Sequence, residues 1–165
     1  MQILGEFQTS VRRALWEIDP EWESYRGLII CGTHSPKLSE LDYFIDLIRD
    51  ARVKGTPYLG ICYGYQLSAI EWARNAMGIK DATSEEFGVR GTFVVQKRKD
   101  LKVGLYNGES YWNNYEVVID WEQPKHFFIS QSHPEYQSSI DNPHPLLLDF
   151  INYCKNYARS SADTE

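Results

Sequence analysis

Two short runs of apolar residues, each bounded by turn residues, constrain the fold of this chain more than any other feature. They cover 27–32 (GLIICG) and 57–61 (PYLGI), and each is followed by apolar residues at helical spacing. Continuous apolar runs of strand length are typical of strands buried on both faces, as in a parallel sheet. Strands that alternate with helices predict an α/β fold, with a mainly parallel central sheet flanked by helices.

The segments around these runs predict the remaining elements. Apolar residues at helical spacing indicate helices, whereas short runs rich in β-branched and aromatic residues indicate strands. The expected helices are 11–16, 38–51, 65–76 and one that begins at Pro145, and the further strands are 1–7, 92–95, 103–106, 115–119 and 126–130. The later strands are joined by short turns and predict an antiparallel addition to the sheet. We expect 1–158 to form a single domain and 159–165, which is small and polar, to be a frayed tail.

Composition excludes several classes of protein. The chain has 165 residues and a formal net charge of −6, without a dense basic face, so no nucleic-acid partner is expected. No apolar run is long enough to cross a membrane, and the N-terminus does not resemble a signal peptide, which predicts a cytoplasmic protein without membrane contact. Three cysteines cannot all pair, and the cysteine and histidine spacing fits no zinc pattern. We therefore expect no metal, no cofactor and reduced thiols.

A nucleophile motif follows the second apolar run directly, as Gly60-Ile61-Cys62-Tyr63-Gly64. A nucleophile at such a strand-to-helix turn sits in strained backbone geometry, and the flanking glycines let strand and helix pack closely. The N-terminus of the helix favours the Cys62 thiolate, and the backbone N–H of Tyr63 would face a developing oxyanion. The alternative is a buried cysteine between two glycines that only permit tight packing.

A base for this thiol is offered by His133, which precedes Pro134 and Glu135 just after a strand-like run. Alternate residues of an extended segment point to the same side, so His133 and Glu135 can project together. A carboxylate beside an imidazole fixes its tautomer and stabilises the imidazolium. Although a His-x-Glu pair alone is more often surface chemistry, here it predicts a Cys-His-Glu triad with Cys62. The remaining histidines lack such a neighbour and are expected to serve loops or packing: His34, His126 and His144.

These residues, in this order, resemble the class I glutamine amidotransferases. Segment 57–66 (PYLGICYGYQ) is similar to the nucleophile elbow of that class, and 131–136 (QSHPEY) to its His-Pro-Glu element. Within the class the resemblance is closest to the glutaminase domain of CTP synthase, to which three further segments are similar: 81–87 (DATSEEF), 115–117 (YEV) and 144–146 (HPL). The resemblance extends from about Gly27 to about Phe150 and implies a flavodoxin-like fold.

The resemblance also implies a chemistry and a set of site residues. Cys62 would attack a γ-carboxamide, His133 would protonate the leaving ammonia and then activate water, and Glu135 would orient His133. The backbone N–H groups of Thr33 and Tyr63 would form the oxyanion hole. Substrate contacts are implied for Gly32, Gln66, Glu86, Asn114 and Tyr115. Gln66 could instead face solvent on its helix, and Glu86 could cap or salt-bridge a loop.

Two positions depart from the class. Thr33 stands where the class has the second glycine of a loop, and a β-branched residue disfavours positive φ, which leaves the geometry of its N–H open. Asn114 stands where the CTP synthases carry an arginine that helps to hold the substrate. Losing a charge-assisted contact costs about 1.5–3 kcal/mol if nothing replaces it, which favours weaker glutamine binding or another head group. Tyr111 and Trp112 could form an aromatic wall or belong to the core.

The leading hypothesis is a stand-alone cysteine-dependent amidohydrolase that cleaves the γ-amide of glutamine, or of a related small γ-glutamyl compound, through a thioester. It would either hydrolyse its substrate or deliver ammonia to a separate synthetase subunit, and a homo-oligomer is left open. The alternatives are a weakly active or inactive glutaminase-fold binding or regulatory module, and a subunit that only a synthetase partner activates.

Overall fold

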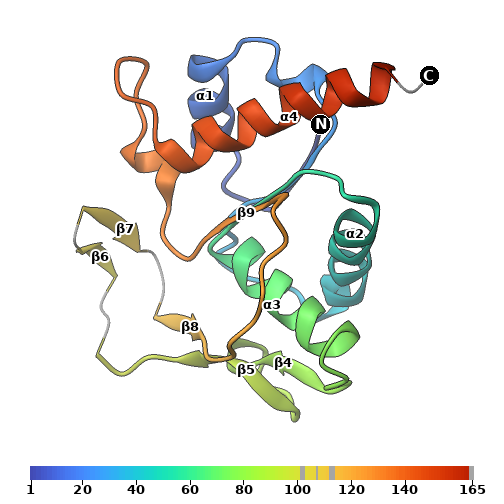
Figure 1. Cartoon of the computed structure of the whole chain (residues 1–165). Coiled ribbons are helices and arrows are strands. Elements are labelled where there is room, and N and C mark those ends of the chain that lie inside the picture. The colour runs from blue at the N-terminus through green and yellow to red at the C-terminus, as the bar shows by residue number, and fades with distance from the viewer. Residues whose placement is uncertain (101–102, 107, 112–113, 164–165) are drawn as a thin grey trace.

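A four-stranded parallel sheet forms the centre of the molecule (Figure 1). The computed structural model describes residues 1–100, 103–106, 108–111 and 114–163. The strands lie in the order β1 (Gln2–Leu4), β2 (Leu28–Ile30), β3 (Tyr58–Ile61) and β9 (Phe127–Ser130), and each neighbouring pair is parallel. The predicted α/β class and parallel sheet are therefore confirmed.

Four α-helices cover this sheet, two on each face (Figure 1). They are α1 (Thr9–Ile18), α2 (Leu41–Lys54), α3 (Tyr63–Asn75) and α4 (Pro145–Asp163), and short 3₁₀ turns lie at Trp22–Ser24, Leu38–Glu40, Glu85–Phe87 and Pro134–Gln137. Side chains of a strand point alternately to its two faces. Accordingly Leu28 and Ile30 pack in the core on the side of α2 and α3, whereas Ile29 packs with α1 and α4. The predicted burial of β2 on both faces follows from this arrangement.

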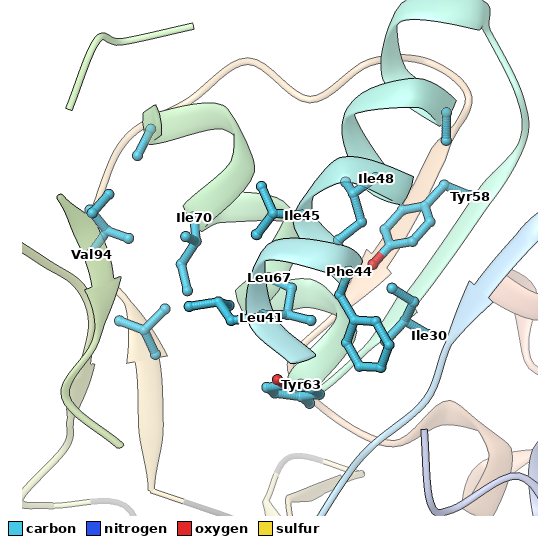
Figure 2. Close-up of a cluster of buried hydrophobic side chains, with 14 of the residues drawn as sticks. Ile30, Leu41, Phe44, Ile45, Ile48, Tyr58, Tyr63, Leu67, Ile70 and Val94 are labelled. Atoms are coloured by element: carbon cyan, nitrogen blue, oxygen red, sulfur yellow. The ribbon is translucent and has the colours of Figure 1, made fainter. Parts of the chain in front are cut away.

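The core beneath α2 and α3 shows why these two segments are helical (Figure 2). Phe44, Ile45 and Ile48 recur at helical spacing on α2 and meet Leu67 and Ile70 of α3. Side chains that meet in this way remove apolar surface from water, which is the main favourable contribution to folding. The α2 helix ends at Gly55, whose φ of 77° is the left-handed conformation typical of a helix C-terminus.

The second half of the chain adds a smaller sheet on the other side of α3 (Figure 1). It contains β4 (Ala82–Ser84), β5 (Thr92–Lys97) and β8 (Tyr115–Val117), with β5 and β8 antiparallel. A separate antiparallel pair is formed by β6 (Gly104–Tyr106) and β7 (Glu109–Tyr111). The predicted antiparallel addition is present, but β4 and β7 were not predicted, because their sequences, ATS and ESY, contain no run of β-branched or apolar residues.

The C-terminal end differs from the prediction. Helix α4 continues to Asp163, so residues 159–163 are helical and not the frayed tail that composition suggested, while 164–165 lie outside the described residues. The Ser160 hydroxyl donates to the Asn156 carbonyl at 3.0 Å, one turn earlier, a local hydrogen bond that serine makes inside helices. Residues 159–163 are thus helical, although their small polar composition predicted a tail.

A buried ion pair ties α2 to α3. Glu71 is 0% exposed, and Arg52 donates to both of its carboxylate oxygens over 2.8–3.0 Å. A second fixed contact lies at the start of α3, where the hydroxyl of Tyr58 donates to the Gly64 carbonyl at 2.6 Å. Both contacts hold α3 against its neighbours, and α3 begins directly after the predicted nucleophile.

Candidate active site

Cys62 occupies the junction between β3 and α3 in a strained conformation. Its φ is 55° and its ψ is −101°, and it is the only non-glycine residue with positive φ in the part of the chain that the structure describes. Such geometry costs on the order of 1–3 kcal/mol and persists where the surrounding structure enforces it. The strand before and the helix after Cys62 do so, and its backbone N–H donates to the Ser130 carbonyl of β9 at 2.7 Å.

Three glycines make this junction sterically feasible. A Cβ on Gly64 would lie 2.1 Å from the Ile30 carbonyl oxygen, and one on Gly60 would lie 2.9 Å from the backbone of Gly64. A Cβ on Gly32 would lie 2.7 Å from Cε1 of His133. The first two glycines therefore allow β2, β3 and α3 to pack closely, and the third leaves space for the imidazole.

His133 and Glu135 form a buried hydrogen-bonded pair. The distance from His133 Nδ1 to Glu135 Oε1 is 2.6 Å, and the two side chains are 1% and 0% exposed. The backbone on either side is also held: the His133 N–H donates to the Ser110 carbonyl of β7 at 2.7 Å, and Arg13 of α1 donates to the Glu135 carbonyl at 2.8 Å. A carboxylate at this distance from Nδ1 fixes the ring orientation and directs the other ring nitrogen elsewhere.

One small cavity of about 50 Å³ brings these groups together. Cys62 and His133 both line it, and the other lining residues are Phe7, Gly32, Thr33, His34 and Glu86. Burial raises the pKa of the Glu86 carboxyl, and the nearby His34 opposes that shift. The cavity therefore combines a thiol, an imidazole and a carboxyl group in one partly desolvated space.

Gln66 and Gln131 form a chain of amide contacts that ends at the nucleophile. Gln66 is 1% exposed, and its Nε2 donates to Oε1 of Gln131 at 3.1 Å. The Nε2 of Gln131 in turn lies 3.6 Å from the Cys62 Sγ. Gln66 is thus buried, and the alternative that it faces solvent is wrong.

Some of the remaining predicted site residues line this cavity and others do not. Thr33 lines it and does not adopt positive φ, so the β-branched side chain is accommodated in ordinary backbone geometry. The Tyr63 side chain is buried against Phe44 and Phe87, which leaves its backbone at the N-terminus of α3. Asn114 and Tyr115 do not line this cavity. Trp112 lies outside the described residues.

Comparison with known proteins identifies the family. The model of the family "Glutamine amidotransferase class-I" matches residues 4–127, which is more than half of the chain. The chain belongs to this family. The matched region contains the predicted nucleophile of this amidotransferase domain and ends before His133.

The domain is similar to longer relatives over only a limited share of their length. It is 37% identical to CTP synthase of Rickettsia rickettsii, over 91% of this chain and 37% of that protein. It is 29% identical to CTP synthase of Methanoregula boonei, over 84% of this chain and 36% of that protein. The chain thus spans about a third of these relatives.

The fold of the amidotransferase domain matches that of a solved glutaminase domain. A solved structure of the glutaminase domain of Trypanosoma brucei CTPS with bound acivicin superposes with a TM-score of 0.72, covering 94% of this chain and 93% of that one at 19% identity. At this identity the likeness establishes the fold. Within the described residues, no group of His, Cys, Asp and Glu could hold a metal ion, and no helix has the length and hydropathy to cross a membrane.

Sequence reasoning missed several residues of the site. Gln131 touches the nucleophile, and the period of two that pairs His133 with Glu135 also places Gln131 on their side, so this signal was present. His34, expected to serve a loop or packing, lines the cavity. Ser110 and Arg13 hold the backbone of the His-Pro-Glu element from distant parts of the chain, and no local pattern marks either residue.

Proposed function

We propose that this amidotransferase domain by itself hydrolyses the γ-amide of glutamine, or of a related γ-glutamyl compound, with Cys62 as nucleophile and His133 as acid and base. The observation that carries the proposal is the lining of one cavity by a cysteine in strained elbow geometry and by a histidine whose Nδ1 lies 2.6 Å from a buried carboxylate. A histidine that is oriented by a carboxylate and lies in the same cavity as a cysteine can act as the base that activates the thiol.

The reaction would proceed in two steps. The Cys62 thiolate attacks the amide carbon, and His133 donates a proton to the departing nitrogen, so that ammonia leaves and a γ-glutamyl thioester remains. His133 then takes a proton from water, the hydroxide attacks the thioester, and the acid product leaves while the thiolate is restored. Glu135 acts as a positioning residue, because its contact with Nδ1 directs Nε2 of His133 to the reacting atoms.

The remaining predicted residues would bind the substrate. The backbone N–H groups of Thr33 and Tyr63 would stabilise the oxyanion, which is supported by the position of Thr33 in the cavity and of Tyr63 at a helix N-terminus. Gly32 and Glu86 border the same cavity, and Gln66 reaches the thiol through Gln131. We assign the Glu86 carboxylate to the ammonium group of the substrate.

The size of the cavity bears on both alternatives to this function. About 50 Å³ approaches the volume of one or two water molecules, whereas small-molecule sites are typically about 300–1,000 Å³. The site must therefore open before an amino-acid amide enters. A synthetase partner that stabilises the open form would make this domain a partner-activated subunit, and a site that does not open would leave a weakly active binding module.

The decisive experiment is release of ammonia and glutamate from glutamine by the purified protein and by the Cys62→Ala variant, followed by a panel of γ-glutamyl amides. We expect release that depends entirely on Cys62. Residual turnover by Cys62→Ala would refute the assignment of the nucleophile.

A labelling experiment separates an incompetent site from a closed one. The diazoketone analogue of glutamine should alkylate Cys62 stoichiometrically, while the buried Cys31 and Cys154 serve as internal controls. Burial raises the pKa of both control thiols, to about 12 for Cys154, which keeps them protonated and unreactive at neutral pH. Labelling without turnover would favour the partner-activated subunit, and neither labelling nor turnover would favour the binding module.

A further inference from the structure

A second cavity of about 210 Å³ lies beyond Gln131. Gln131 lines this outer cavity, and its Nε2 is also 3.6 Å from the Cys62 Sγ. The outer cavity is otherwise lined by Tyr65, Arg98, Tyr111, Tyr115, Glu116 and Val117. One side chain, that of Gln131, thus contacts both the nucleophile and the outer cavity.

Neither cavity alone suits an amino-acid amide, but the two together do. The inner cavity of about 50 Å³ has space for little more than a carboxamide, and the outer one has no nucleophile. If the Gln131 side chain rotates away, the joined volume approaches the lower end of the roughly 300–1,000 Å³ that ligand sites occupy. A substrate with its amide at Cys62 would then place its other end in the outer cavity.

The position of Arg98 gives the outer cavity its chemistry. Strands β5 and β8 pair with Lys97 opposite Tyr115, and the backbone N–H of Arg98 donates to the Asn114 carbonyl, so Arg98 lies directly across the ladder from Asn114. Residues that face each other across antiparallel strands project to the same side, with Cβ atoms roughly 4.5–5.5 Å apart. The side chains of Arg98 and Asn114 therefore lie on the same side of the sheet. Arg98 supplies a positive charge there, whereas Asn114 supplies a neutral amide.

The guanidinium group is oriented by two acids and retains a free donor. Nε and Nη2 of Arg98 donate to Asp100 over 3.2 and 3.1 Å, and Nε is 3.4 Å from Glu116. Among the described residues, Nη1 of Arg98 has no hydrogen-bond partner. A guanidinium group has five N–H donors in a planar fork, so two acids on one side leave donors for a further carboxylate.

We propose that the outer cavity is the head-group site of the substrate and that Arg98 binds the α-carboxylate there. This inference rests on the proposed function and narrows its substrate class to γ-amides whose head group carries a carboxylate. Asp100 and Glu116 already balance much of the charge of Arg98, so the contribution of this contact to affinity is moderate, about tenfold, at the lower end for hydrogen bonds to charged groups.

The test measures binding without turnover, by isothermal titration calorimetry on the Cys62→Ala variant. Two amides are compared: glutamine, and 4-aminobutanamide, which has the same amide and amino groups but no carboxylate. We expect Arg98→Ala to weaken glutamine binding about tenfold and to leave 4-aminobutanamide binding unchanged. Arg98→Lys should retain part of the preference for glutamine. Lys99→Ala removes an exposed neighbouring cation that lines neither cavity, and serves as the matched control.

Two outcomes would overturn the proposal while leaving the proposed function intact. One is equal glutamine affinity with and without the Arg98 side chain, and the other is equal weakening of both amides, which would indicate a structural effect. Binding of neither amide to any variant would also overturn it. In that case Cys62-dependent hydrolysis in the separate turnover assay decides whether the proposed function fails as well.

Discussion

Replacing Gly32 by alanine should misplace His133 with little damage to the fold. Gly32 does not have positive φ, so alanine is compatible with its backbone. The added Cβ would lie 2.7 Å from Cε1 of His133, and ordinary contact begins at 3.4 Å, so the imidazole must move by about 0.7 Å. Because a 1 Å misplacement can reduce the rate about a hundredfold, we expect kcat/KM for amide hydrolysis to fall roughly ten- to hundredfold. Overpacking of this kind costs about 1–3 kcal/mol of unfolding free energy.

The assay combines turnover with a readout that needs no substrate. The first measurement is kcat/KM for Cys62-dependent ammonia release, and the second is the rate of Cys62 alkylation by iodoacetamide at neutral pH, which should also fall if His133 promotes the thiolate. Urea denaturation reports stability. Gly55→Ala is the control for lost stability. Alanine at the left-handed φ of 77° strains the end of α2, but the added Cβ meets nothing within 4 Å and lies outside the site.

The result that would refute this reasoning is a Gly32→Ala protein with wild-type kcat/KM and wild-type alkylation. It would mean either that the imidazole shifts without consequence or that His133 is not the base. A loss of activity equal to that of Gly55→Ala would attribute the effect to stability instead of position.

Three further predictions concern polar groups whose substitution is measured by its effect on stability. Arg52→Ala should lower the free energy of unfolding by about 3–5 kcal/mol, because it leaves the fully buried Glu71 carboxylate unpaired, and urea denaturation measures the loss. Burial raises the pKa of the Glu86 carboxyl above its ordinary 4.5, so the native state binds this proton more tightly than the unfolded chain does. The contribution of Glu86 to wild-type stability should therefore fall as the pH rises above 4.5, and Glu86→Gln should be the more stable protein at neutral pH but not below 4.5. Tyr58→Phe removes the 2.6 Å hydrogen bond to the Gly64 carbonyl and should lower the thermal midpoint, with a loss of about 1–2 kcal/mol.

Much of the fold was predictable because its signals are local. The run before Cys62 is apolar throughout, which marks a strand covered on both faces, and the spacing of Phe44, Ile45 and Ile48 marks the covering helix. Composition did not predict that residues 159–163 continue α4. The three-residue strands β4 and β7 were not predictable, because their pairing is decided by partners elsewhere in the chain.

The sequence by itself determined which groups could carry the chemistry: Cys62 between its glycines, and His133 with Glu135 at a spacing that allows contact. Only the tertiary structure decided what surrounds them. The contact of Gln131 with the Cys62 thiol joins residues 69 positions apart, and Arg98 stands beside Asn114 only because β5 and β8 pair in one register. The spacing of residues along the chain determines which side chains share a face only within one helical turn or between alternate residues of a strand. Contacts between distant residues depend on how whole helices and strands pack.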